Sequence, residues 1–451
     1  MRSFYILLFA LTTLFPSVLN AQNGWKAGLA RTRITPSENM WMAGYGFRTK
    51  PSEGTGQELW GKALALEDAR GNKSLFITTD ILGFSKEVSD NVRRYLQQKH
   101  GLSKAQVILS SSHTHSGPVL SNALVDIYPL TAGEDAKIVR YTAFFEKEII
   151  KICEQALKAL KPVRIETETG VARFAVNRRT NEEAKIQQLF ELNGPGDYSV
   201  PVLKISNPDN TIAAILFGYA CHSTVLNEYK WSGDYPGYAQ DELEKKYPGA
   251  TAMFFLGSAG DQNPMPRRGV TRAQQYGRDL ASAVTRVLEE PMKTLSPALS
   301  VAYDEIDLKL MPAPSKEQLE KLVREKSGYE KQWAERMLKK AVKNEGFITS
   351  YPYPVQVWMI GEQPVFSLGG EVTIEYTVKL KQMFGNNVFV AAYTNDVMGY
   401  IPSLKVLREG GYEGETSQMV YGLPSKWQPS IESDILGKAF ELGTKVGLTG
   451  K

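Results

Sequence analysis

The sequence predicts an α/β fold in which mixed β-sheets are buried between helices and form a single large catalytic domain. Three observations carry this prediction. Several runs of β-branched and aromatic residues are almost uninterrupted by polar ones, as expected for strands covered on both faces. Helices with recognisable ends lie between these runs, and one hairpin indicates some antiparallel pairing. A chain of 451 residues that is 42% hydrophobic and 23% charged can bury a large core.

The predicted strands share one pattern, in which an apolar run ends in small or polar residues. In α/β folds, polar residues just past the carboxyl ends of strands line the crevice where ligands bind. The runs are Ser74–Asp80, Gln106–His113, Ala213–His222, Ala252–Asp261, Pro364–Glu371 and Val388–Asp396. The stretch Val355–Leu368 is predicted to be a hairpin that turns at Gly361–Gln363.

The predicted helices are marked by apolar spacing and by their end signals. A helix over Ser85–Lys99 stops before Gly101, and Ser315 with Gln318 forms a capping box. Further helices are expected at Asp135–Leu160, Pro236–Lys246, Thr271–Glu289 and Glu330–Lys343. The charged stretch 315–343 is interpreted as a helical insertion within the catalytic domain that overhangs the pocket.

The amino terminus has the layout of a secretory signal peptide. Basic Arg2 precedes an apolar run from Phe4 to Phe15, then helix-breaking Pro16 and small Ala21. Cleavage after Ala21 would leave residues 22–451 as a secreted or periplasmic protein. No other segment is apolar for long enough to predict a transmembrane helix, which leaves peripheral contact with a membrane open.

Charge and cysteine content narrow the class of protein further. The net charge of +4 comes without a basic cluster, so no nucleic-acid partner is expected. Cys153 and Cys221 are too few for a disulfide framework. Cys153 lies on the apolar side of a predicted helix and is expected to be a buried free thiol.

Three of the four histidines lie at ends of predicted strands, where a pocket would form. His113 and His115 are two residues apart, so their imidazoles can face one site. This spacing leaves open whether the pair binds a metal or makes ordinary hydrogen bonds in a loop. With His222 and a carboxylate, a Zn²⁺ site with an open position for water is chemically reasonable. Spacing does not select Glu371 over the other acids.

Several motifs occur in the order found in one enzyme family. They are SSHTHSGP (111–118), NRRT (177–180), ACHST (220–224), SGDYPGYA (232–239), GSAGDQNP (257–264), GGEVT (369–373), NDVMGY (395–400) and GYEGET (411–416). Through them the chain resembles the neutral/alkaline non-lysosomal ceramidase family over nearly its whole length from about Trp25. The match is at the level of a superfamily.

The resemblance implies a zinc ion held by four residues: His113, His222, Glu371 and Tyr400. A nearby cation lowers the pKa of a phenol, which makes Tyr400 an acceptable ligand. The resemblance also implies catalytic roles for His115, Arg178 and Tyr412, which would stabilise an oxyanion and protonate the leaving amine.

Two neighbouring residues bear on the mechanism. Asp261 is interpreted either as an acceptor that orients a ligand histidine or as part of an ordinary Gly-Asp turn. Asn263 stands where the family commonly has a serine, so a serine acyl-enzyme is not expected. Water activated by a metal needs no nucleophilic side chain and is compatible with Asn263.

The sequence therefore predicts an exported zinc-dependent hydrolase that cleaves an N-acyl amide bond, with ceramide-like lipids as the first substrate class. One alternative keeps the zinc site but assigns it an ester, a glycan or a glycoconjugate. A lipid substrate predicts a deep apolar pocket, whereas a glycan predicts a shallower cleft with aromatic and charged residues. A noncatalytic binding protein is the third hypothesis.

Overall fold

The computed structural model describes residues 24–450, and the predicted signal peptide lies outside the described residues. Its central feature is a mixed sheet with nine strands among the described residues, in the order β4-β3-β2-β1-β5-β7-β8-β9, with β11 paired to β5. The strands are β1 (Trp25–Arg33), β2 (Trp60–Glu67), β3 (Lys73–Thr79), β4 (Val107–Ser111), β5 (Lys161–Val171), β7 (Ser199–Ser206), β8 (Ile212–Tyr219), β9 (Thr251–Leu256) and β11 (Lys293–Thr294).

The two halves of this sheet have the same plan. In each half, three antiparallel strands are followed by a helix and a fourth, parallel strand at the edge: β1-β2-β3 with β4, and β5-β7-β8 with β9. The two edge strands, β4 and β9, approach each other within 8 Å between Cα atoms. The sheet is therefore strongly curled, and the loops that follow β4, β8 and β9 meet.

A second, smaller sheet packs against the first. It has the order β12-β13-β14-β16, formed by β12 (Leu299–Lys309), β13 (Ser350–Ile360), β14 (Gln363–Leu368) and β16 (Phe389–Ala391). The predicted hairpin is present and turns at Gly361–Glu362, since Gln363, placed in the turn by the prediction, already belongs to β14. An apolar core from both sheets, including Phe76, Phe255 and Trp358, fills the space between them.

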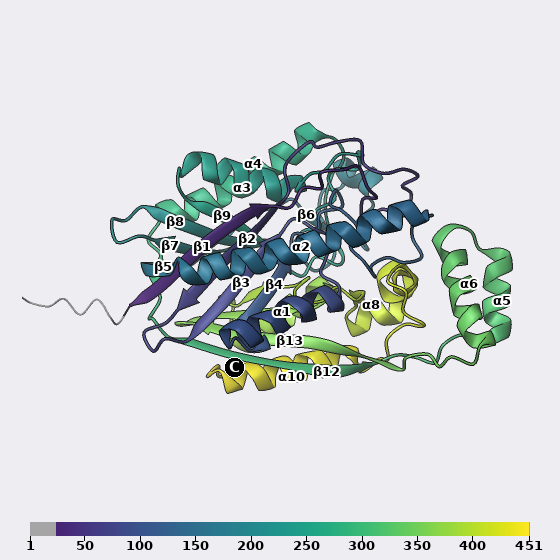
Figure 1. Ribbon diagram of the computed structural model, residues 1–451. Helices are drawn as coiled ribbons and strands as arrows, with labels where there is room; N and C mark the ends of the chain where they lie inside the picture. Colours follow the sequence, from purple (N-terminus) through teal and green to yellow (C-terminus); the bar gives the residue numbers. More distant parts are fainter. Residues whose placement is uncertain (1–23, 451) are drawn as a thin grey trace, which may run out of the picture.

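The helices cover the outer faces of the two sheets (Figure 1). One group packs on the larger sheet: α1 (Lys86–His100), α2 (Ala132–Lys158), α3 (Asp234–Lys246) and α4 (Val270–Glu289). On the smaller sheet lie α7 (Ile374–Phe384) and α10 (Ile431–Lys445). This arrangement confirms the predicted α/β class with buried sheets between helices. Shorter elements are α8 (Leu404–Glu409), α9 (Ser417–Val420), the 3₁₀ turns Lys104–Gln106 and Glu183–Gln188, and a π-helical turn at Tyr412–Thr416.

The predicted helical insertion is a hairpin of α5 (Lys316–Glu325) and α6 (Gly328–Val342), which projects at one end of the molecule (Figure 1). Its small apolar core includes Leu319, Trp333 and Met337. Nε and Nη2 of Arg336 in α6 donate hydrogen bonds to the two carboxylate oxygens of Asp126, at 2.6–3.0 Å. The hairpin is thereby attached to the loop before α2.

Two further predictions concern sulfur and the membrane. Cys153 and Cys221 are both buried and free, as expected for Cys153. Burial raises the pKa of the Cys153 thiol, which keeps it protonated. Within residues 24–450, no helix has both the length and the apolar character needed to cross a membrane.

Candidate active site

Two short two-stranded sheets bring distant segments to the loops at the ends of β4, β8 and β9. One pairs β6 (Ala175–Asn177) with β10 (Gln262–Pro264), and the other pairs β15 (Glu371–Val372) with β17 (Tyr400–Ile401). The chain after β16 bonds to both edge strands, through Ala392 N to Leu256 O and Asn395 N to Leu109 O. These contacts close the gap between the edges of the curled sheet.

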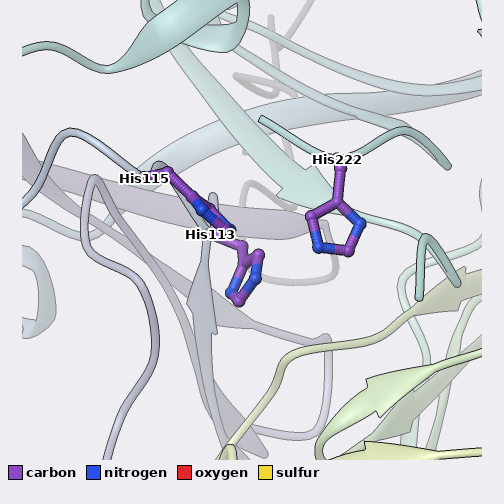
Figure 2. Close-up of side chains that lie close together, drawn as sticks. All are labelled: His113, His115 and His222. Carbon is purple, nitrogen blue, oxygen red and sulfur yellow. The ribbon is translucent and has the colours of Figure 1, made fainter. Parts of the chain in front are cut away.

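His113, His115 and His222 gather in this region (Figure 2). His113 and His115 come from the loop after β4, and His222 faces them from the loop after β8. His113 has a φ of 55°, a left-handed conformation that is uncommon outside glycine and clusters at functional sites. The rings of His113 and His222 are 4.9 Å apart between centroids.

The two ligand candidates His113 and His222 are oriented by backbone carbonyls. Nδ1 of His113 donates to Leu82 O at 2.6 Å, and Nδ1 of His222 donates to Ala259 O at 2.5 Å. Because a carbonyl only accepts, Nδ1 of each ring carries the proton. Each Nε2 therefore presents a lone pair, as in metal sites where the second ring nitrogen bonds to a backbone carbonyl.

Both Nε2 atoms point at the carboxylate of Glu371. Oε2 of Glu371 is 3.2 Å from Nε2 of His113 and 3.0 Å from Nε2 of His222, and all three side chains are at least 97% buried. Burial lowers the pKa of His222 to about 4, so this ring is neutral at pH 7. Two lone pairs and a carboxylate repel one another unless a cation lies between them. This donor set, two imidazoles and one carboxylate, fits a divalent metal with an open position.

Glu371 is fixed by its backbone and by a tyrosine. The preceding residue, Gly370, has a φ of 72°, and a Cβ there would lie 2.8 Å from Gly399 O, so the turn requires glycine. Oε1 of Glu371 accepts a hydrogen bond from the Tyr421 hydroxyl at 2.5 Å. Tyr421 was not predicted from the sequence.

Tyr400 reaches the site through its backbone, because it lies opposite Glu371 in the β15–β17 pair. Its hydroxyl accepts a hydrogen bond from Nη2 of Arg178 at 3.0 Å and makes no hydrogen bond to the histidines or Glu371 among the described residues. Burial raises the pKa of Tyr400, although the charge of Arg178 opposes this rise. The side chains of three of the four predicted ligands, His113, His222 and Glu371, therefore meet. Tyr400 lies next to them through its backbone pairing with Glu371.

Arg178 is held rigidly beside the site. Its Nε donates to Glu413 at 2.7 Å and its Nη1 donates to Asn263 at 3.3 Å. Glu413 also pairs with Arg179 at 2.7 Å, so one buried carboxylate holds both arginines. Glu413 itself follows Tyr412 in the GYEGET motif and was missed as a contact.

Tyr412 and His115 present free groups toward the site. Tyr412 starts the π-helical turn, is 42% exposed, and its ring lies 5.3 Å from that of Tyr400. His115 lies 4.9 Å from His113 between ring centroids, and neither of its ring nitrogens has a hydrogen-bond partner among the described residues. Burial lowers the pKa of His115 well below its usual range, so the ring is neutral and can donate one proton.

Asp261 does not take the proposed role of orienting a ligand histidine. Its Oδ1 accepts from the backbone N–H of Ile374 at 2.9 Å, at the first turn of α7, and its Oδ2 accepts from Asn177 at 2.9 Å. Its backbone carbonyl also accepts from Arg178 N. Asp261 thus ties the segment that carries Glu371 to the segment that carries Arg178, while the histidines are oriented by backbone carbonyls.

A cavity of about 340 Å³ opens beside these residues. His115, Arg178, Tyr400 and Tyr412 line it, so all four lie where a bound molecule can be reached. Tyr329 of α6 also lines the cavity, and the α5–α6 hairpin therefore contributes to its wall. The other lining residues are Gly44, Tyr45, Gly46, Phe47, Leu124, Ile127, Tyr128, Thr224, Arg267 and Val420.

The family model described as neutral/alkaline non-lysosomal ceramidase, N-terminal, matches residues 25–266. The chain belongs to this family. Neutral ceramidase B of Dictyostelium discoideum is 29% identical over 235 residues, which cover 46% of this chain and 30% of that protein. Neutral ceramidase of Pseudomonas aeruginosa is 25% identical over 252 residues, or 53% of this chain and 37% of that protein. The matched segments thus span about a third of these ceramidases.

The likeness in three dimensions extends further than the likeness in sequence. The solved structure of neutral ceramidase from Pseudomonas aeruginosa matches 95% of this chain and 76% of that chain, with a TM-score of 0.71 and 18% identity. At this identity the match establishes the ceramidase-like fold. The fold therefore extends well beyond residue 266, to the segments that carry Glu371 and Tyr412.

Proposed function

We propose that the protein is an exported, zinc-dependent hydrolase that cleaves an N-acyl amide bond, with ceramide-like lipids as the first substrate class to test. The observation that carries this proposal is the convergence of Nε2 of His113, Nε2 of His222 and Oε2 of Glu371 on one point. Membership of the ceramidase family supports the reaction class. Export follows from the signal peptide predicted for residues 1–21.

The metal would be held by His113, His222 and Glu371, with Tyr400 as the fourth ligand. Nitrogen and carboxylate donors in this number are typical of catalytic zinc and unlike the all-oxygen sites of Mg²⁺ or Ca²⁺. When bound, zinc supplies a Lewis acid that polarises the amide carbonyl and activates water as a nucleophile.

The residues of the chain supply the remaining steps. Arg178, fixed by Glu413 and Asn263, presents its guanidinium to the oxyanion that forms when the oxygen of water adds to the carbonyl carbon. Cleavage of the C–N bond then requires a proton on the leaving nitrogen. Neutral His115 has one N–H to donate, and the exposed hydroxyl of Tyr412 is the second candidate donor.

A second candidate substrate class is a glycan or glycoconjugate acted on by the same metal. The specific observation in its favour is the cavity wall, which contains six aromatic residues and two arginines rather than a continuous aliphatic surface. Aromatic faces of this kind are common platforms for sugars. A substrate screen distinguishes the two classes.

The proposal is tested by assaying zinc-loaded protein against N-acylsphingosine, with detection of both the fatty acid and the amine by mass spectrometry. Chelator should abolish cleavage, and zinc should restore it. His115→Ala should keep its zinc but lose about 100-fold or more in turnover, the usual contribution of a general acid or base. Normal turnover by His115→Ala would remove its assigned role. No cleavage of any amide by protein with stoichiometric zinc would remove the amide-cleaving function.

A further inference from the structure

Among residues 24–450, no carboxylate lines the cavity beside the site. Among its lining residues, the charged or ionisable side chains are Arg178, Arg267, His115 and several tyrosines. The partners of the arginines in and beside this wall decide whether a net positive charge faces the molecule that enters.

Two of the nearby arginines are neutralised by partners. Arg178 pairs with Glu413 at 2.7 Å. Arg267 donates through Nε and Nη2 to one oxygen of Glu183, and its backbone N–H donates to the other. Neither arginine leaves a net charge in the cavity.

Two other arginines, which contact lining residues of the cavity, have no carboxylate partner among the described residues. Arg48 is 97% buried and donates to the carbonyls of Ala43 and His115 at 2.8 and 2.7 Å. Arg268 is exposed and donates to Thr224 O at 2.9 Å. Neither forms a salt bridge to a carboxylate of residues 24–450.

Both guanidinium groups lie against Tyr45, which lines the cavity. They are 4.9 Å (Arg48) and 5.8 Å (Arg268) from the centre of its ring. Burial raises the pKa of Tyr45 to about 12, so its phenol carries no negative charge that could offset them.

The buried acid Asp234 offsets only part of this charge. It lies close enough for its charge to be felt by Tyr45, but both of its oxygens face backbone amides, those of Val225, Leu226 and Tyr235. One carboxylate against two arginines leaves one positive charge at Tyr45.

We propose that the preferred substrate carries an anionic oxygen group, such as a carboxylate or sulfonate, on the part that lies against Tyr45 and Arg268. This inference rests on the proposed amide-cleaving function and names its substrate class. N-acyl amino acids and N-acyl aminosulfonates are the simplest compounds that combine the amide with such a group. Positive charge near a pocket also concentrates anions there and speeds their association.

The test compares N-dodecanoylglycine with N-dodecanoylethanolamine on the zinc-loaded protein. The two substrates share the acyl chain and the N–CH₂ link and differ in whether a carboxylate or a hydroxymethyl group follows. We expect kcat/KM for the glycine conjugate to be about tenfold higher, the usual gain from one charge-assisted hydrogen bond. The advantage should shrink as salt is raised from 0.02 to about 0.5 M. N-dodecanoyltaurine distinguishes carboxylate from sulfonate.

Variants locate the charge that gives this preference. Arg268→Gln should reduce the ratio of the two kcat/KM values about tenfold, and Arg268→Lys should keep part of it. Arg286→Gln is the matched control, because Arg286 is also exposed and forms no salt bridge to a carboxylate of residues 24–450. It lies about 24 Å from the start of α4, whereas Arg268 just precedes that helix. The ratio for Arg286→Gln should equal that of the wild type. The salt dependence of the wild type tests the inference independently of any variant.

The outcomes separate the inference from the proposed function. If the ethanolamine conjugate is cleaved as fast as the glycine conjugate at low salt, the inference is overturned and the amidase function stands. An unchanged ratio in Arg268→Gln would overturn the assignment to Arg268. If no amide substrate is cleaved, N-acylsphingosine included, both fail.

Discussion

Tyr421 provides a sharp test of how Glu371 is held. Its hydroxyl donates to Oε1 of Glu371 at 2.5 Å, while Oε2 faces the two histidines. Glu371 is 97% buried, and no other donor reaches Oε1 among the described residues. The substitution Tyr421→Phe removes one oxygen atom and leaves a buried carboxylate oxygen without its donor.

The expected size of the effect follows from that contact. A hydrogen bond to a charged group contributes about 1.5–3 kcal/mol, which corresponds to about 10- to 150-fold in a dissociation constant. Loss of a residue that orients a metal ligand typically costs about 10- to 100-fold in metal affinity. We therefore expect the Kd for zinc to rise about 10- to 100-fold in Tyr421→Phe, with the fold retained.

The assay is a competition titration of zinc between the protein and a chromophoric chelator at pH 7. Tyr393→Phe is a matched control, because the Tyr393 hydroxyl is 3.5 Å from Oε2 of Glu371, too long for a strong hydrogen bond. Its Kd should change by less than about threefold. If Tyr421→Phe bound zinc as tightly as the wild type, the reasoning about Glu371 as an oriented ligand would be refuted.

Three further predictions concern the site and its support. Gly44→Ala would place a Cβ 2.5 Å from the His115 ring and push that ring out of position. Turnover should therefore fall about 10- to 100-fold at unchanged zinc content, and an unchanged kcat would contradict this. Arg336→Ala leaves Asp126 buried without its partner and should destabilise the α5–α6 hairpin by about 2–3 kcal/mol, measured as faster amide exchange confined to residues 316–342. Burial raises the pKa of Asp396 from 3.8 to about 7, so the folded state binds its proton more tightly than the unfolded state. That contribution to stability, up to about 4 kcal/mol, is present below about pH 4 and is lost as the pH rises through 7. The free energy of unfolding, measured with urea, should therefore fall less between pH 5 and pH 8 in Asp396→Asn than in the wild type. An equal fall in both proteins would contradict the raised pKa of Asp396.

The strands that the sequence predicted are those buried on both faces. All residues of β4, β14 and β16 are buried, and their apolar runs are continuous. The long strands β1, β5 and β12 were not singled out, because each has exposed or half-exposed positions filled by charged residues. β2 is buried but is interrupted by Lys62, whose ammonium is held by Glu244, Gln240 and the Ala252 carbonyl.

The site was predictable to the extent that it lies at strand ends. His113 and His115 follow β4 directly, and His222 follows β8, so position and spacing brought the histidines together. Glu371 and Tyr400 came only from the resemblance, because neither has a spacing relation to the histidines. Their meeting depends on the β15–β17 pair, which joins segments of two residues each.

Other contacts had no sequence signal at all. Tyr421 follows a single-turn helix, α9, and its hydrogen bond to Glu371 spans 50 positions. For Asp261, the sequence left the choice between orienting a histidine and an ordinary turn. A carbonyl can orient a histidine as well as a carboxylate can, and backbone carbonyls leave no trace in the sequence.

Zinc content is the most direct test of whether the residues around Glu371 form one metal centre. Protein purified after zinc loading and exhaustive dialysis should contain one zinc per chain by elemental analysis, and His222→Ala should contain none while remaining folded by circular dichroism. A wild-type protein without zinc, or a His222→Ala protein that retains one zinc per chain, would contradict the account.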